Sequence, residues 1–229
     1  MIFSSSDWHS PPDGLPQKVK EWIRSGKELN SKLIVVGDAF DLVIYGVDKY
    51  RNSIAVNDLI ECLDGYNLDF ICGNHDSIKL VNKLSLPNNI HVSKQLDIDF
   101  NGVTWHFEHG HRLGGWGTVG KIIPTFTNFM AEYFPKLWYL ICKKMGWLAS
   151  SLKSNGEREK YSKLVGLVHS AYLEYIEKNK VNCVIGHTHR TFASDVWTNS
   201  HKFTLLDCGN IGDGSYCLIG KVYQGIDWL

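Results

Sequence analysis

Five short clusters of acidic, imidazole and amide side chains have the chemistry to bind metal ions. Carboxylates, imidazoles and amide oxygens are the donors that a pair of divalent cations takes, and one carboxylate can bridge two ions. No cysteine lies in the clusters, which disfavours a Cys-rich structural zinc site and favours manganese, iron, cobalt or catalytic zinc. Together the clusters predict a two-metal site. They are Asp7-Trp8-His9, Gly37-Asp38 with Asp41, Gly73-Asn74-His75-Asp76, His109-Gly110-His111 and Gly186-His187-Thr188-His189.

The clusters follow short apolar runs that are typical of buried β-strands, at 33–36, 68–71, 103–107, 181–185 and 203–206. Apolar residues at helical spacing lie between these runs, at 15–23 and at 54–63. This alternation predicts an α/β fold built of βαβ units with largely parallel strands. In such sheets, ligands bind beyond the carboxyl ends of the strands, which is where the clusters lie.

The segment at about 114–180 is predicted to be a wholly helical insertion and a candidate lid over the site. Its second half, 157–178, places apolar residues on one face of an amphipathic helix that leads into the strand at 181–185. Its first half is rich in aromatic residues with lysines between them. These aromatics either pack on the domain, bind a ligand, form a dimer contact or lie at a membrane surface. A membrane contact would be at the surface, because 137–152 is too short to span a bilayer.

Composition predicts one domain over 1–229, in a chain whose 24 basic residues balance 24 acidic ones. A net charge of zero disfavours nucleic acid as the general partner and leaves a small phosphorylated molecule as the expected one. The six cysteines are scattered without a CxxC pair, most of them in apolar runs. We therefore expect reduced, buried thiols and a cytoplasmic protein without a secretory signal, peripheral to the membrane if the insertion binds lipid.

In their order along the chain, Asp-x-His, Gly-Asp-x-x-Asp, Gly-Asn-His-Asp, His-Gly-His and Gly-His-x-His resemble the motifs of the calcineurin-like metallophosphoesterase family. The resemblance spans nearly the whole chain. It implies a four-layer αββα sandwich of two mixed β-sheets with flanking helices, and two divalent ions, with manganese favoured over iron, zinc or cobalt. The implied ligands are Asp7, His9, Asp38 and His189 for one ion and Asp38, Asn74, His109 and His187 for the other, so that Asp38 bridges.

The helical insertion between His109 and Gly186 is similar in position to the lid of the UDP-2,3-diacylglucosamine diphosphatase branch of that family. At the third motif that enzyme has Gly-Asn-Arg-Asp, whereas this chain has His75, as the family's ordinary phosphatases do. His75 is predicted to hydrogen-bond the phosphoryl group or protonate the leaving oxygen, with Asp41 orienting its imidazole. These two residues are the candidate catalytic pair.

Several other polar residues have two interpretations. Arg112 and Arg190 directly follow ligand motifs and either bind a second phosphate or are solvated at the surface. His111 is equally a site residue or a structural one. Asp76 is predicted to cap a helix that begins near Ser77. The remaining histidines are predicted to be structural or exposed; they are His91, His106, His169 and His201.

The predicted function is hydrolysis of a phosphate ester or pyrophosphate bond by a metal-bridged hydroxide, with a lipid-linked or nucleotide-sugar molecule among the candidate substrates. A nuclease or cyclic-nucleotide phosphodiesterase is the alternative, which the balanced charge disfavours. A non-catalytic binding module is a third hypothesis. Every implied ligand position holds a competent donor, which argues against that third hypothesis.

Overall fold

The computed structural model describes residues 1–111, 113, 134, 137, 140, 141, 155–198, 201–220 and 224–228. For 155–164 and 224–228 the backbone alone is described. Arg112 and most of the predicted lid, at 114–154, therefore lie outside the described residues.

The first β-sheet has six strands in the order β11-β10-β1-β2-β3-β4. The four strands β1 (Ile2–Ser5), β2 (Lys32–Val36), β3 (Leu68–Ile71) and β4 (Ile90–Ser93) run parallel to one another. β10 (Ser215–Ile219) pairs antiparallel with β1, and β11 (Gln224–Trp228) pairs antiparallel with β10. The sheet is therefore mixed, with a parallel half and an antiparallel half.

The second β-sheet has five strands in the order β5-β6-β7-β9-β8. β6 (Val103–Glu108), β7 (Asn182–Ile185) and β9 (His201–Cys208) form its parallel centre. β5 (Gln95–Phe100) and β8 (Thr191–Thr198) pair antiparallel at its two edges. The prediction of largely parallel strands was wrong for β5, β8, β10 and β11, which pair antiparallel with their neighbours.

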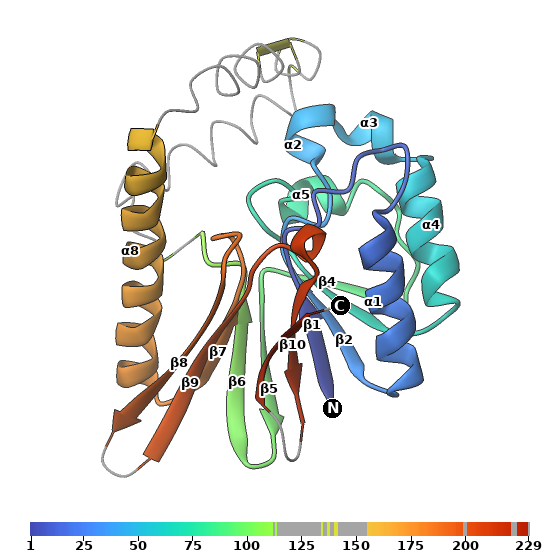
Figure 1. The fold of residues 1–229 in the computed structure, drawn as a ribbon. Coiled ribbons are helices and arrows are strands. Elements are labelled where there is room, and N and C mark those ends of the chain that lie inside the picture. The colour runs from blue at the N-terminus through green and yellow to red at the C-terminus, as the bar shows by residue number, and fades with distance from the viewer. Residues whose placement is uncertain are drawn as a thin grey trace.

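The longer helices cover the outer faces of the two sheets (Figure 1). α1 (Gln17–Glu28) and α4 (Ile54–Leu63) lie on the first sheet, and α8 (Asn155–Asn179) lies along the second, against β7, β8 and β9. The shorter helices are α2 (Leu42–Tyr45), α3 (Val47–Tyr50), α5 (Ile78–Val81) and the 3-10 turn η1 (Ile211–Asp213). Helix, sheet, sheet and helix form four layers, which confirms the predicted fold class.

The apolar strand residues alternate between two cores. In β2, Leu33 and Val35 face α1 and α4, whereas Ile34 and Val36 face the second sheet. In β7, Val184 faces the first sheet and Ile185 faces α8. A strand that is covered on both faces needs apolar residues at every position, which explains why these strands appear in the sequence as continuous apolar runs.

The predicted helix 157–178 is α8, and the predicted strands are β2, β3, β6, β7 and β9 with ends that differ by up to two residues. β1, β4, β5, β8, β10 and β11 were not predicted. Among the described residues, no helix is long and apolar enough to cross a membrane.

Candidate metal centre

The five polar clusters meet at one edge of the sandwich, beyond the carboxyl ends of β1, β2, β3, β6 and β7 (Figure 1). Parallel strands end at the same edge of a sheet, so the loops that follow them become neighbours. Both sheets supply loops to this edge, and the loops after β1, β2 and β3 of the first sheet face the loops after β6 and β7 of the second. Residues that are about 180 positions apart in the chain therefore come into contact.

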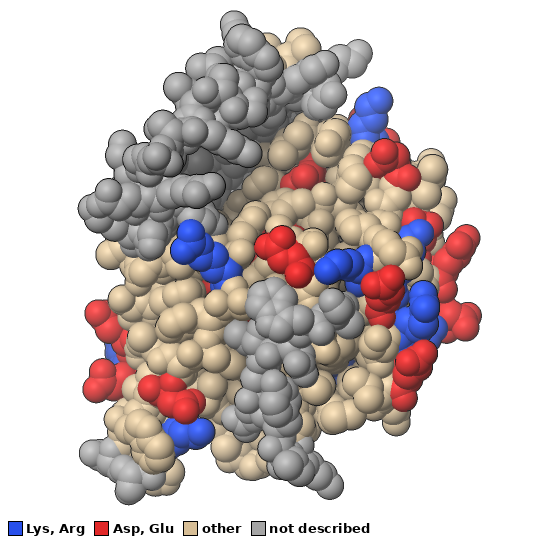
Figure 2. All heavy atoms as spheres, viewed as in Figure 1, with Lys and Arg blue, Asp and Glu red and all other residues tan. Residues whose placement is uncertain are grey.

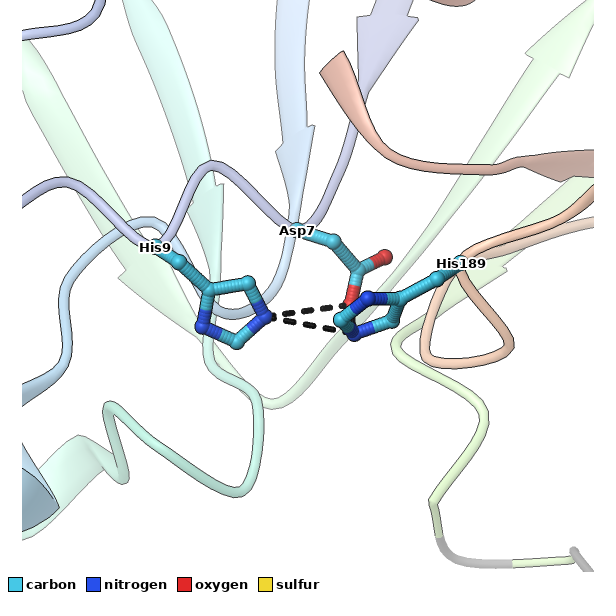
Figure 3. A group of neighbouring side chains, drawn as sticks. All are labelled: Asp7, His9 and His189. Atoms are coloured by element: carbon cyan, nitrogen blue, oxygen red, sulfur yellow. Dashed lines mark hydrogen bonds and ion pairs between the residues drawn. The ribbon is translucent and has the colours of Figure 1, made fainter. Parts of the chain in front are cut away.

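Asp7, His9 and His189 form one half of the centre, which we call the open subsite (Figure 3). The Nε2 atoms of His9 and His189 lie 3.2 Å apart, and they lie 3.9 and 3.3 Å from Asp7 Oδ1. The side chain of Asp7 is fully buried, whereas those of His9 and His189 are 22% and 41% exposed. The open subsite therefore has a buried carboxylate beneath two accessible imidazoles.

Asp38, Asn74, His109 and His187 form the other half, which we call the buried subsite. His109 Nε2 lies 3.1 Å from Asp38 Oδ2 and 3.2 Å from Asn74 Oδ1. Donor atoms of Asp38, His109 and His187 all lie within 4.8 Å of one another. A third group at the same spacing joins Asp38 to His9 and His75, so Asp38 lies between the two subsites.

These donor spacings fit divalent cations. Two ligands that bind one ion at roughly 2.1 Å are about 3.0 to 3.4 Å apart in octahedral or tetrahedral geometry. The His9–His189, His109–Asp38 and His189–Asp7 separations of 3.1 to 3.3 Å fall in that interval, and the His9–Asp7 separation is longer at 3.9 Å. Asp7 Oδ1 is also buried without a hydrogen-bond partner, which leaves its lone pairs available to an ion. The donor set therefore fits divalent ions that prefer nitrogen and oxygen ligands.

Hydrogen bonds on the far side of the rings orient the histidine ligands. Nδ1 of His9 donates to Asp41 Oδ1 at 2.8 Å, and Nδ1 of His109 donates to the Val36 carbonyl at 2.8 Å. In a neutral ring, donation from Nδ1 leaves the lone pair on Nε2, the atom that faces the other donors. The backbone N–H of His187 donates to Asp7 Oδ2 at 2.9 Å and links the two sheets. This is the outer support that ligating histidines usually have.

Five of the candidate ligands have positive φ angles. These are five of the ten non-glycine residues with positive φ that the structure describes, and left-handed backbone at such residues costs energy. The strained conformation aims each side chain from its strand end into the centre. The residues are Asp7, His9, Asp38, His187 and His189, with φ between 45° and 74°.

Two glycines at strand ends leave space for the ligands. Gly37 has φ of 84°, and a Cβ atom there would overlap the ring of His109. At Gly73, a Cβ atom would overlap Asp38 Oδ1. An alanine at either position would displace a ligand of the buried subsite, so the glycines beside Asp38 and Asn74 have a steric role.

His75 and Asp41 form a hydrogen-bonded pair beside the open subsite. Nδ1 of His75 donates to Asp41 Oδ1 at 2.7 Å, the same oxygen that His9 uses. Burial disfavours the charge on Asp41, but the hydrogen bonds from His75 and His9 outweigh it and lower the pKa to about 2. Burial also disfavours the charge on His75, but the hydrogen bond to Asp41 and the negative charge of Asp38 outweigh it and raise the pKa of His75 to about 9. Without metal, His75 is therefore protonated at neutral pH.

The buried subsite holds opposite charge states on its two histidines. Burial and the positive charge of His109 lower the pKa of His187 to about 3. At His109, burial is outweighed by the charge of Asp38 and its hydrogen bond, which raise the pKa to about 10. A proton on His109 thus neutralises Asp38 when no cation is bound, and a bound cation would take over that role.

Asp76 does not cap a helix, and that prediction was wrong. Its buried carboxylate accepts hydrogen bonds from the backbone N–H groups of Gly73, Asp38, Ala39 and Phe40, at 2.6 to 3.2 Å. The loop after β2 presents three N–H groups to this carboxylate, whereas the short helix α5 has Ser77 as its N-cap. Asp76 therefore fastens the loop that carries Asp38 to the loop that carries Asn74.

The remaining predicted residues have varied positions. Arg190 is exposed directly after His189. The His111 ring centroid lies 5.4 Å from that of His109 and 6.2 Å from that of His187, beside the buried subsite. His91 and His201 are exposed, and His106 is buried against Asp97, with 2.6 Å between Nδ1 and Oδ1.

Three supporting residues were missed as parts of the site, namely Asp207, Asn210 and Tyr50. Asp207 and Asn210 follow the apolar run of β9 in the same way that the recognised clusters follow theirs, and this signal was present in the sequence. Asn210 Nδ2 lies 3.5 Å from His189 Nδ1. Tyr50 accepts from the Asp41 N–H and donates to the Ser10 carbonyl, which holds the Asp41 loop in place.

The chain resembles several solved structures over nearly its whole length. An archaeal phosphodiesterase has 12% identity, with 100% of this chain and 98% of that chain covered, and a TM-score of 0.49. The phosphoesterase YfcE of E. coli has 15% identity, coverage of 96% and 88%, and a TM-score of 0.48. Vps29 of Entamoeba histolytica, solved with Zn²⁺, has 13% identity, coverage of 98% and 79%, and a TM-score of 0.43.

No family model matches the chain, and no curated protein does. All three identities are below 25% and all three TM-scores are below 0.5, so the activities of those proteins do not transfer to this chain. The UDP-2,3-diacylglucosamine diphosphatase branch suggested by the sequence does not appear among these three structures, and that resemblance stays a prediction.

Proposed function

We propose that the chain is a metal-dependent phosphoesterase that uses two divalent ions, one in each subsite. The observation that supports this function is the convergence of seven donor residues from five loops, at spacings that suit shared coordination. Asp38 lies between the subsites and is the bridging ligand in this proposal. Two divalent cations held there would activate a water molecule and neutralise charge on the phosphoryl oxygens.

The protein's own residues supply the remaining parts of the reaction. In the metal-free protein the pKa of His75 is raised to about 9, and its ring lies beside His9, with ring centroids 4.8 Å apart. It is therefore placed to donate a hydrogen bond to the phosphoryl group or a proton to the leaving oxygen. Asp41 holds the ring and keeps it protonated. Arg190 is the candidate for contact with a further phosphate or a polar head group.

We infer a small phosphorylated substrate, with manganese as the first metal to test. Acidic and basic side chains of the described residues are interspersed on the face in Figure 2, without a continuous basic track. A duplex-binding enzyme requires such a track to neutralise phosphates along the helix.

The five described cysteines are unpaired thiols, which supports a reducing compartment, the cytoplasm.

The function is tested by hydrolysis of a monoester, a diester and a nucleotide-sugar pyrophosphate, with the protein stripped by chelator and then reloaded with manganese. We expect turnover of at least one bond type in the loaded protein, none in the stripped protein, and recovery on reloading. His109→Gln removes a ligand, whereas His91→Gln changes an exposed histidine outside the centre and is the matched control. Stoichiometric metal binding without turnover of any substrate would contradict the phosphoesterase and favour a binding module.

A further inference from the structure

A second network of buried polar groups lies behind the loop that carries His187 and His189. Asp207, at the end of β9, is fully buried and accepts a hydrogen bond from Thr188 Oγ1 at 2.6 Å. The same carboxylate oxygen lies 2.9 Å from Nε2 of His169, a residue of α8 that is 8% exposed. The three side chains connect a helix to the middle residue of the Gly-His-x-His motif.

The network reaches the backbone on both sides of the two ligands. The Thr188 oxygen accepts from the Arg190 N–H at 3.2 Å, which closes the turn after His189. Asp207 Oδ1 accepts from the Gly209 N–H at 3.0 Å, and the Gly209 carbonyl accepts from Ser6 Oγ at 2.6 Å, next to Asp7. Both His187 and His189 have positive φ, so their loop needs support from outside to hold that conformation.

His169 itself is fixed by packing. Its ring stacks on Phe192 of β8, with centroids 4.1 Å apart and 15° between the planes. Because a carboxylate has no proton to give, Nε2–H of His169 and the Thr188 hydroxyl are the donors to Asp207. Loss of either donor would leave one buried acceptor with fewer partners and release the loop.

We propose that His169, Asp207 and Thr188 are positioning residues that set the affinity of both metal sites by holding His187 and His189 in place. This inference rests on the proposed function, because it assumes that these two histidines bind metal. The loop supplies one ligand to each subsite, so its release weakens both sites together. Outer partners of this kind contribute roughly 10- to 100-fold to metal affinity.

The test compares Thr188→Val with Thr204→Val. In each variant, a methyl group of similar size replaces a buried hydroxyl that donates to an aspartate. Thr188 follows β7 and Thr204 lies in β9, and both strands belong to the second sheet. Thr204 Oγ1 donates to Asp195 Oδ1 of β8 at 2.9 Å, and the Thr204 N–H donates to Asn182 Oδ1 of β7 at 2.8 Å; both partners lie outside the ligand loop. We expect Thr188→Val to weaken binding of both manganese ions about 10-fold or more in calorimetric titration of the stripped protein, with Thr204→Val unchanged.

His169 gives a rescue experiment. His169→Leu removes the donor, whereas Gln places an amide N–H near the position of Nε2. We expect His169→Leu to weaken metal binding about 10-fold and His169→Gln to recover most of it. The melting temperature of each stripped variant is measured alongside, since a purely structural role would lower it in Thr188→Val and Thr204→Val alike and leave metal affinity unchanged.

The outcomes separate the two proposals. Wild-type protein that binds no divalent metal would overturn the proposed function itself. Wild-type protein that binds two ions, with affinities unaltered by Thr188→Val and His169→Leu, would overturn the positioning role and leave the function standing. Weakening of one ion alone would also contradict the inference, because the loop contributes to both subsites.

Discussion

The two halves of the metal centre differ in burial, and this difference separates their expected roles. In the buried subsite, Asp38 and His109 are at most 1% exposed, and Asn74 and His187 are half-buried. The Val36 carbonyl accepts from His109, and the His75 N–H donates to Asp38. In the open subsite, His9 and His189 are 22% and 41% exposed above the buried Asp7. Buried ligands are held rigidly and screened little by water. We therefore expect the buried subsite to hold its ion tightly and the open subsite to exchange its ion and meet the substrate.

The largest effect is expected from the residue that the two halves share. Asp38→Asn keeps an oxygen that can accept from the His75 N–H, now at 2.8 Å, but removes the negative charge between the ions. We expect loss of both ions after dialysis and a fall in hydrolysis of more than about 100-fold, beyond what outer partners contribute. Metal content and turnover are measured together. Retention of two ions would show that Asp38 is not the bridge.

Asp41→Asn is expected to weaken metal binding in the open subsite only. Asp41 orients His9 and keeps His75 protonated, and it has no hydrogen bond to a ligand of the buried subsite. We expect activity to fall roughly 100-fold, as for loss of a general acid, with the pKa of His75 lowered from about 9. Metal titration should show one weakened site and one unchanged site. Equal weakening of both sites would remove the distinction between the subsites.

A pair of ligand variants tests the burial difference through stability. His109→Gln leaves the buried Val36 carbonyl with an altered partner and is expected to lower the free energy of unfolding of the metal-free protein by about 1 to 3 kcal/mol. His189→Gln changes a partly exposed side chain and should alter it by less than about 0.5 kcal/mol. Urea unfolding in chelator measures both. A larger loss for His189→Gln would contradict the comparison.

Both halves of the centre are also expected to make stability depend on pH. In the metal-free protein the pKa of His75 is raised to about 9 and that of His109 to about 10, from 6.5. The stabilisation of the folded protein that each raised pKa gives is complete below about pH 6.5. It is lost as the pH rises through the folded-state pKa of that histidine. His187, whose pKa is lowered to about 3, is almost entirely neutral in both states above about pH 8 and adds little slope there.

We therefore expect the free energy of unfolding in chelator to fall by roughly 4 kcal/mol between pH 7 and 9, about half of it from each histidine. With manganese the slope should reverse, because metal binding releases the proton from His109 and becomes stronger as pH rises. Urea unfolding at a series of pH values, with and without manganese, measures both slopes. A stability that rises with pH in chelator would show that these histidines are not protonated in the folded protein.

The order of strands, helices and polar clusters was readable from the sequence for a physical reason. β2, β3 and β7 are covered on both faces, so most of their positions are apolar and each run ends abruptly at a polar cluster. The edge strands β5 and β8 have one exposed face, and their mixed composition hid them. Asp76 shows the same limit, because three of its partners are backbone N–H groups of a loop 36 to 38 positions away and have no signature in side-chain type.

The sequence by itself determined which residues have the chemistry to bind metal, since carboxylates, imidazoles and an amide recur at strand ends regardless of packing. Only the tertiary structure decided how they divide into an open and a buried subsite, because exposure depends on which sheet and helix cover each loop. It also decided that Asp207 of β9 accepts hydrogen bonds from Thr188 and from His169 of α8. Contacts between distant segments follow from how the two sheets pack, and residue spacing along the chain does not encode that packing.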